Sequence, residues 1–131
     1  MRYMGIDYGK KRVGVAISDE DGKMAFPREV LPNDAKLLAR IKKLCEEQKI
    51  VTIVLGESND FKGQPNKIMK DIEPFKIDLW EETGLPVEYE LEYLTSHQVE
   101  NIFGKTKMLD ASAASIILQS YLDRINSKIK N

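Results

Sequence analysis

The stretch that decides the fold runs Met4-Gly5-Ile6-Asp7-Tyr8-Gly9-Lys10-Lys11-Arg12-Val13-Gly14-Val15-Ala16-Ile17-Ser18. An apolar strand ends at a carboxylate, and a second strand follows in which valine and isoleucine alternate with smaller residues. Gly9 permits a tight turn between them, so we expect a β-hairpin over residues 3–18. Three cations, Lys10, Lys11 and Arg12, crowd that turn beside Asp7.

The charged turn allows two interpretations. It is either an ordinary solvated hairpin turn, or a metal-binding aspartate beside a cationic loop that meets phosphate. A carboxylate that ends a buried strand is costly unless something pairs with it, which favours the second interpretation. A D-x-G pattern alone is a weak signal, so the residues of this stretch leave both open.

The size and composition limit the class of protein. The 131 residues are 42% hydrophobic and 31% charged, which fits one globular domain over residues 1–131 and neither a disordered nor a membrane protein. With 20 Lys and Arg against 21 Asp and Glu, the net charge is -1, which gives no support to a generic polyanion binder but allows a local basic patch. The N-terminus enters a strand without a signal-peptide region, and Cys45 is the single cysteine, so we expect a cytoplasmic protein.

The remaining pattern predicts alternating strands and helices. Strands are expected over residues 24–31, 50–56 and 87–91, the first at a sheet edge because it contains Pro27. One helix is expected from an N-cap at Asn33 or Asp34, and a second from Ile68 to the stop at Gly84 and Pro86, with Pro74 kinking it or starting a new helix. Two more are expected over 95–103 and 110–129. The charged face of the first helix is interpreted as solvated. This order predicts an α/β fold: a mixed five-stranded sheet, three antiparallel strands and then two parallel ones, with helices on both faces.

Several motifs resemble the YqgF (RuvX) family of RNase H-like proteins. The first is Ile6-Asp7-Tyr8-Gly9-Lys10-Lys11-Arg12-Val13-Gly14-Val15-Ala16-Ile17-Ser18-Asp19. The likeness continues through Ala25-Phe26-Pro27 and Ile53-Val54-Leu55-Gly56, and it closes with Leu109-Asp110-Ala111-Ser112-Ala113-Ala114-Ser115-Ile116-Ile117-Leu118-Gln119-Ser120-Tyr121-Leu122. It covers essentially the whole chain.

The resemblance implies a divalent-metal-dependent nuclease that hydrolyses phosphodiester bonds in RNA. The implied role is maturation of the 5′ end of pre-16S rRNA, and the implied catalytic and metal-binding residues are Asp7, Glu92 and Asp110. Two Mg²⁺ or Mn²⁺ ions suit such carboxylates and this reaction. Lys10, Lys11 and Arg12 are the expected substrate-binding residues, Arg12 being suited to bidentate phosphate contact. The expected partner is nucleic acid, RNA or branched DNA, with no membrane, and the expected state is a monomer or weak homodimer.

The chain departs from the family pattern beside the second acid. The family's D-E-R-L-[ST]-T motif aligns with Leu91-Glu92-Tyr93-Leu94-Thr95-Ser96, so the glutamate is kept while the aspartate and arginine are replaced. An arginine lost beside the site removes a possible phosphate contact. Two alternatives therefore stay open: a catalytically weakened nucleic-acid-binding module, and a Holliday junction resolvase-like DNA endonuclease. A fragment of an actin-like ATPase is disfavoured, since the chain is too short for two lobes.

Other candidate residues carry weaker signals. Glu57 follows the central strand, and one hypothesis has it pointing toward Asp7 as a further ligand, against the simpler interpretation of a solvated acid. Three lysines on loops are interpreted as surface residues, His97 as a surface or capping residue, and Phe75 and Trp80 as core residues. The three lysines are Lys62, Lys105 and Lys107.

Overall fold

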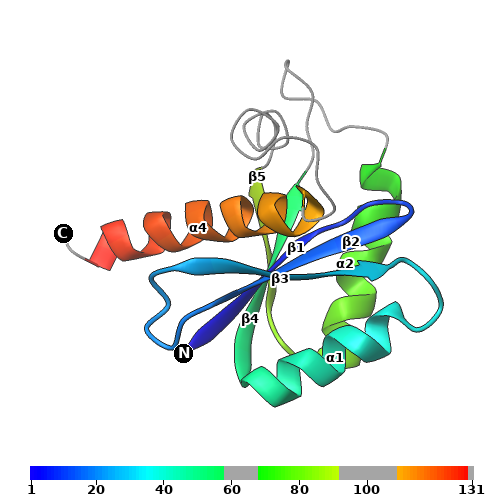
Figure 1. Cartoon of the computed structure of the whole chain (residues 1–131), viewed down its shortest axis with the longest axis horizontal. Helices are drawn as coiled ribbons and strands as arrows, with labels where there is room; N and C mark the ends of the chain where they lie inside the picture. Colours follow the sequence, from blue (N-terminus) through cyan, green and yellow to red (C-terminus); the bar gives the residue numbers. More distant parts are fainter. Residues whose placement is uncertain (58–67, 92–108, 130–131) are drawn as a thin grey trace.

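One mixed sheet organises the part of the chain that the computed structural model describes, residues 1–57, 68–91 and 109–129, without the side chains of 91, 109, 110, 128 and 129. Its strand order is β3-β2-β1-β4-β5 (Figure 1). The strands are β1 (Arg2–Asp7), β2 (Arg12–Ser18), β3 (Ala25–Pro32), β4 (Ile50–Glu57) and β5 (Val87–Leu91). β1, β2 and β3 pair antiparallel, and β4 and β5 run parallel to β1. The predicted fold class is confirmed.

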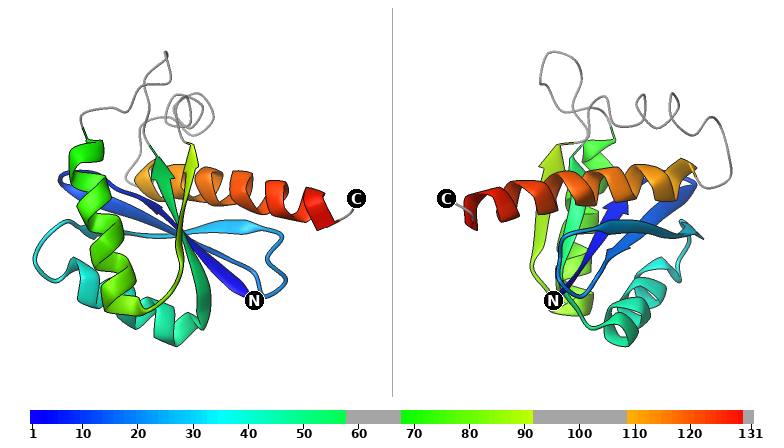
Figure 2. Two further views of the ribbon diagram at one scale, coloured as in Figure 1. Left: turned by 180° about the vertical axis from the view of Figure 1, so that it is seen from behind. Right: turned by 60° about the vertical axis from the view of Figure 1, so that its left-hand side comes forward.

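The helices cover both faces of the sheet (Figures 1 and 2). α1 (Leu37–Gln48) and α2 (Met69–Thr83) pack on one side, which we call the α1/α2 face. α4 (Leu109–Ile129) crosses the other side, the α4 face. None of the described helices combines the length and the apolar character that a bilayer crossing requires. The helix predicted over 95–103 lies outside the described residues.

The pleat of the strands divides the core into two clusters, because successive side chains point to opposite faces. In β1, Met4 and Ile6 belong to the larger cluster with α1 and α2. In β2 and β4, Ala16 and Val54 belong to the smaller cluster with α4. This alternation assigns every strand residue to a face, and therefore also the polar residues at the strand ends.

Gly5 of β1 lets α4 lie directly on the sheet. A Cβ atom there would be 2.7 Å from Leu118 Cβ and 2.8 Å from the carbonyl oxygen of Ala114. Small residues in the first turns of the helix, Ala111, Ser112, Ala113 and Ala114, are all buried. The close approach explains why a glycine stands inside a buried strand.

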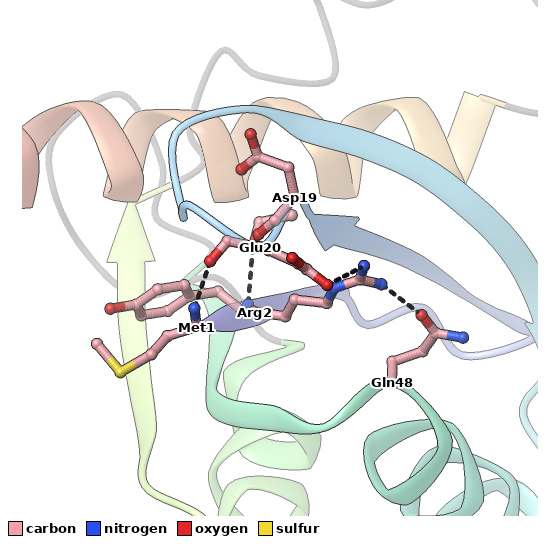
Figure 3. Close-up of polar contacts among 7 residues, drawn as sticks. Met1, Arg2, Asp19, Glu20 and Gln48 are labelled. Atoms are coloured by element: carbon pink, nitrogen blue, oxygen red, sulfur yellow. Dashed lines mark hydrogen bonds and ion pairs between the residues drawn. The ribbon is translucent and has the colours of Figure 1, made fainter.

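The N-terminal edge of the parallel strands is closed by polar contacts (Figure 3). Arg2 donates hydrogen bonds to Gln48 Oε1 at 2.8 Å and to Glu20 Oε1 at 3.4 Å, joining β1 to the end of α1 and to the β2–β3 turn. The Met1 ammonium group donates to the carbonyl oxygen of Glu20. Asp19 accepts from the backbone N–H groups of Lys23 and Met24, and these bonds lower its pKa. This edge is tied down by residues that the candidate site does not use.

Two local predictions are wrong, for the N-cap of α1 and for Trp80, and two are confirmed, for Phe75 and β3; at Pro74 one of two predicted alternatives is excluded. The N-cap residue of α1 is Lys36. The Asp34 side chain accepts a hydrogen bond from the Lys36 backbone N–H, in the turn that precedes the helix. Pro74 lies inside α2 and starts no new helix. Trp80 is 59% exposed, whereas Phe75 is buried as predicted. β3 is an edge strand, and its register shifts beside Pro27, as a proline in a sheet requires.

Candidate active site

Asp7 is the last residue of β1, where the strand leaves the core. It is half-buried, and its cross-strand partner in β2 is Gly14, which has no side chain to fill the space around the carboxylate. Gly5 faces α4, so alternation along β1 puts Asp7 on the same α4 face. The carboxylate therefore lies at the carboxyl edge of the sheet, on the side that α4 covers.

The cationic residues predicted to bind substrate are brought next to Asp7. Lys10 and Lys11 lie in the β1–β2 turn, and Arg12 is the first residue of β2; all three are exposed. Arg12 alternates with Gly14 and so shares the α4 face. A residue two positions from the cross-strand partner is a diagonal neighbour, which a long side chain can reach. The fold thus places Arg12 and Asp7 within reach of each other.

Asn33 holds this turn in place. Its side-chain Nδ2 donates to the carbonyl oxygen of Gly9 at 2.7 Å, and its backbone N–H donates to the carbonyl oxygen of Lys11 at 3.0 Å. A Cβ at Gly9 would be 2.5 Å from the carbonyl oxygen of Arg12, so the turn is also tightly folded. No local sequence signal predicts the Asn33 contacts, because they exist only once β3 pairs with β2.

The start of α4 is directed to the same place. Ala114 touches Gly5, and Asp110 precedes Ala114 by one helical turn, while Asp7 follows Gly5 by two residues. The views agree that the beginning of α4 and the end of β1 lie on the same side of the molecule (Figures 1 and 2). Asp110 is in the first turn of α4, where the helix dipole favours an acid. Its side chain lies outside the described residues.

Glu57 does not support the hypothesis that it points toward Asp7. It follows Ile53 and Leu55 by alternation, and both belong to the cluster on the α1/α2 face. Burial raises the pKa of Tyr89, and the negative charges of Glu73 and Glu57 raise it further, so Glu57 acts on a residue that packs against that cluster. The sheet separates Glu57 from Asp7.

The donor chemistry of the predicted set fits hard divalent cations, which take carboxylate oxygens. Within residues 1–57, 68–91 and 111–127, no group of three His, Cys, Asp or Glu side chains is placed to hold a metal ion. Of the three predicted ligands, Asp7 has a described side chain, and its half-buried position at a strand end suits a ligand. Several predicted positions lie outside the described residues: Glu92, Lys62, Lys105, Lys107 and His97.

A family model described as "RuvX: Holliday junction resolvase" matches residues 1–124. A protein of Nitratidesulfovibrio vulgaris is 34% identical over 98% of this chain and 97% of its own length, and one of Streptococcus suis is 36% identical over 95% and 99%. Both carry the name "Putative pre-16S rRNA nuclease".

The fold is shared with solved resolvases. RuvC of Thermus thermophilus matches with a TM-score of 0.62 at 16% identity, covering 96% of this chain and 97% of RuvC. The fowlpox virus resolvase, solved with Holliday junction DNA, matches with a TM-score of 0.57 at 13% identity, covering 95% and 99%. These likenesses show the RNase H-like fold. The family model and the full-length relatives show that the chain belongs to the RuvX family of nucleases.

Proposed function

We propose that this nuclease hydrolyses phosphodiester bonds in RNA with divalent metal ions held by Asp7, Glu92 and Asp110. The observation that carries the proposal is the position of Asp7, half-buried at the end of β1 and on the face where the first turns of α4 rest on Gly5. Glu92 follows the last residue of β5 by one position, so all three acids come from chain segments that end or begin near this edge.

The cations of the β1–β2 turn and of the start of β2 bind the phosphate groups of the substrate in this proposal. Lys10, Lys11 and Arg12 are exposed and can meet the phosphate groups on either side of the bond to be cleaved. Arg12 offers a planar fork of donors that suits two phosphate oxygens at once, and the bonds of Asn33 fix the turn on which it stands. When bound, Mg²⁺ or Mn²⁺ ions supply the Lewis acidity that phosphodiester hydrolysis needs. The residues of this chain bind the strand and orient its phosphate over the acids.

The proposed substrate is the 5′ end of pre-16S rRNA. It rests on the names of relatives that match this chain over nearly their full lengths. A weakened binding module remains the second candidate, favoured by Leu91 at the end of β5, where the family has an aspartate. A resolvase-like DNA endonuclease is the third.

One experiment separates these functions. Labelled precursor-like rRNA ends, unrelated single-stranded RNA and a four-way DNA junction are incubated with Mn²⁺, Mg²⁺ or EDTA. We expect metal-dependent cleavage of the rRNA end, and a loss of rate of at least about a hundredfold in Asp7→Asn, since even partners of metal ligands often cost 10- to 100-fold. Asp21→Asn, at the opposite edge of the sheet, is the matched control and should keep the rate. Binding without cleavage would favour the second candidate, and cleavage of the junction alone the third.

We further propose that residues 1–131 form one domain that works in the cytoplasm as a monomer or weak homodimer. The described strands form a single sheet, and Cys45 is a buried free thiol. Ile77 and Trp80 are exposed on α2, and exposed apolar residues of this kind support at most a weak self-contact. Light scattering across protein concentrations measures the oligomeric state.

A further inference from the structure

We propose that the nucleic-acid strand bound at Asp7 continues past the β1–β2 turn and along one cationic face of α1. This face, which we call the α1 track, consists of Lys36, Arg40 and Lys43. The inference rests on the proposed function, because it extends the binding surface of the same site. It also gives a role to helix charges that the sequence pattern leaves as a solvated surface.

The α1 track begins beside the β1–β2 turn that carries Lys10 and Lys11. The backbone N–H of Asn33 donates to Lys11 at 3.0 Å, and its side chain donates to Gly9 at 2.7 Å. The β1–β2 turn and the loop between β3 and α1 are therefore one hydrogen-bonded unit. Lys36 follows Asn33 by three residues, so a strand that leaves Lys11 meets Lys36 next.

Helical geometry aligns the rest of the track. Spacings of four and three residues from Lys36 to Arg40 and from Arg40 to Lys43 place the three cations on one side of the helix, with a rise of about 1.5 Å per residue. The helix packs through other residues, and those that it buries are Leu37, Ile41, Leu44 and Cys45. Lys36 and Lys43 are exposed, and the Arg40 side chain is 38% exposed. The cations therefore face solvent in a row.

The charge around the track is strongly uneven. Residues 33–43 hold four cations, Lys36, Arg40, Lys42 and Lys43, against one acid, although the whole chain has a net charge of -1. That acid, Asp34, forms an ion pair with Arg40 at 3.1 Å. In α2 the balance of charge is reversed, because the helix carries more acids than cations. The acids are Asp71, Glu73, Asp78, Glu81 and Glu82, and the cations are Lys70 and Lys76. A polyanion that extends from the carboxyl edge of the sheet, where Asp7 lies, is attracted to α1 and repelled from α2.

The track has a defined end. Glu47 lies four residues after Lys43 on the same side of α1, so the favourable potential stops in the last turn of the helix. A short oligonucleotide fits on the β1–β2 turn and the carboxyl edge at Asp7 alone, whereas a longer one also reaches α1. Length dependence is thus the signature of the track.

The test compares Lys36→Gln/Lys43→Gln with the control Lys23→Gln/Lys49→Gln. The control removes the same charge from exposed lysines in the β2–β3 turn and just before β4, at the opposite edge of the sheet. Binding of 6- and 20-nucleotide single-stranded RNA is measured by anisotropy in EDTA at several salt concentrations, and circular dichroism checks folding. We expect the Kd for the 20-mer to rise at least about fivefold in the track variant, and the salt slope to fall by about 1.4 for two lost contacts. The 6-mer and the control should change less than about twofold.

The outcomes separate the track from the nuclease. Equal weakening in the control variant, equal weakening for the 6-mer, or an unchanged 20-mer Kd overturns the track. Cleavage with Mn²⁺ by the wild type and its loss in Asp7→Asn are followed in the same preparations. If that cleavage is present while the track variant binds like the wild type, the track is wrong and the nuclease stands. If the wild type neither binds nor cleaves RNA, both are wrong.

Discussion

A single missing side chain, that of Gly5, sets the distance between the two halves of the candidate site. The atoms that a Cβ would meet are the Cβ of Leu118 and the carbonyl oxygen of Ala114. The carbonyl belongs to the helix backbone and cannot turn aside, unlike the end of a flexible side chain. Asp7 on the strand and Asp110 on the helix are therefore held in register by this contact.

Gly5→Ala should destabilise the protein and slow cleavage together. The added methyl group pushes α4 off β1, and overpacking of this kind costs about 1–3 kcal/mol of the free energy of unfolding. Urea unfolding and the cleavage rate with Mn²⁺ measure the two effects. Gly84→Ala is the control: its φ of 71° makes alanine strained there, at about 1–2 kcal/mol, but a Cβ at Gly84 meets nothing within 4 Å. Gly84→Ala should lower stability and keep the rate. A Gly5→Ala protein with the wild-type rate would contradict the role of the contact.

At the scale of elements, the β1–β2 turn is held by Asn33, the residue that follows β3. Gly9 and Lys11 supply carbonyl groups, and Asn33 supplies both donors. A matching arrangement exists at the other end of the hairpins, where Asn126 of α4 donates through Nδ2 to the carbonyl oxygen of Gly22 at 3.0 Å. The two bonds are chemically alike and differ in their distance from Asp7, which makes them a natural pair for comparison.

Asn33→Asp should weaken substrate binding more than catalysis. The carboxylate cannot donate to Gly9, so the bond is lost at a cost of about 1–2 kcal/mol of stability, and the turn that carries Lys10 and Lys11 loosens. We expect KM for RNA to rise while kcat stays nearly constant, measured by steady-state cleavage. Asn126→Asp should destabilise the protein by a similar amount without raising KM. Asn33→Ala removes the same donor without adding a charge and should also raise KM; an unchanged KM in Asn33→Ala would show that added negative charge, and not the turn, is responsible.

Elements whose signals are local could be predicted from the sequence. The hairpin, the edge position of β3 and the buried strand β4 follow from alternation, proline and β-branched residues, and all are observed. The prediction that Trp80 lies in the core is wrong because Trp80 directly follows the buried Leu79, and neighbouring helical residues differ by about 100° in direction. The hypothesis that Glu57 points toward Asp7 fails for a similar reason in a strand, where odd and even positions face opposite sides. Helical and strand periodicity accounts for both positions.

Features that depend on pairing between distant segments could not be predicted. Asn33 looks like a helix cap in the sequence, and only the register of β3 with β2 reveals its bonds to the turn. Gly5 could have been noticed, since a glycine inside a strand often marks a close backbone approach. What approaches it, the first turns of α4, lies more than a hundred residues away in the sequence.

At the scale of the whole molecule, two buried acids and one partly buried acid of raised pKa should make the protein sensitive to alkali. Burial raises the pKa of Cys45 from 9.0 to about 12, and burial together with a hydrogen bond to Glu88 raises the pKa of Tyr121. The pKa of Tyr89 is raised as well. The folded protein thus holds protons that the unfolded chain releases, so stability is full below about pH 9 and falls as the pH rises through 9 and 10.

Urea unfolding at pH 7.5, 9.0 and 10.5 measures this dependence. We expect the free energy of unfolding to fall between pH 9.0 and 10.5, and to fall less steeply in Cys45→Ala and Tyr121→Phe, each of which removes one of the titrating groups. The group that Cys45→Ala removes is the thiol whose pKa burial raises to about 12. Stability that is constant or increases over this range would contradict the buried placement of these groups.

The division of the core into two clusters means that the two faces of the sheet can be exposed separately. The larger cluster joins α1 and α2 to the sheet, and the smaller one, on the other face, joins α4. If α4 detaches, the smaller cluster alone is exposed, so this local opening costs less than global unfolding. Amide protons of α4 then exchange with solvent sooner than those of β1 and β4. Under the proposed mechanism, Asp110 would leave with the helix while Asp7 stayed with the sheet, so this opening should abolish cleavage while most of the structure is still intact.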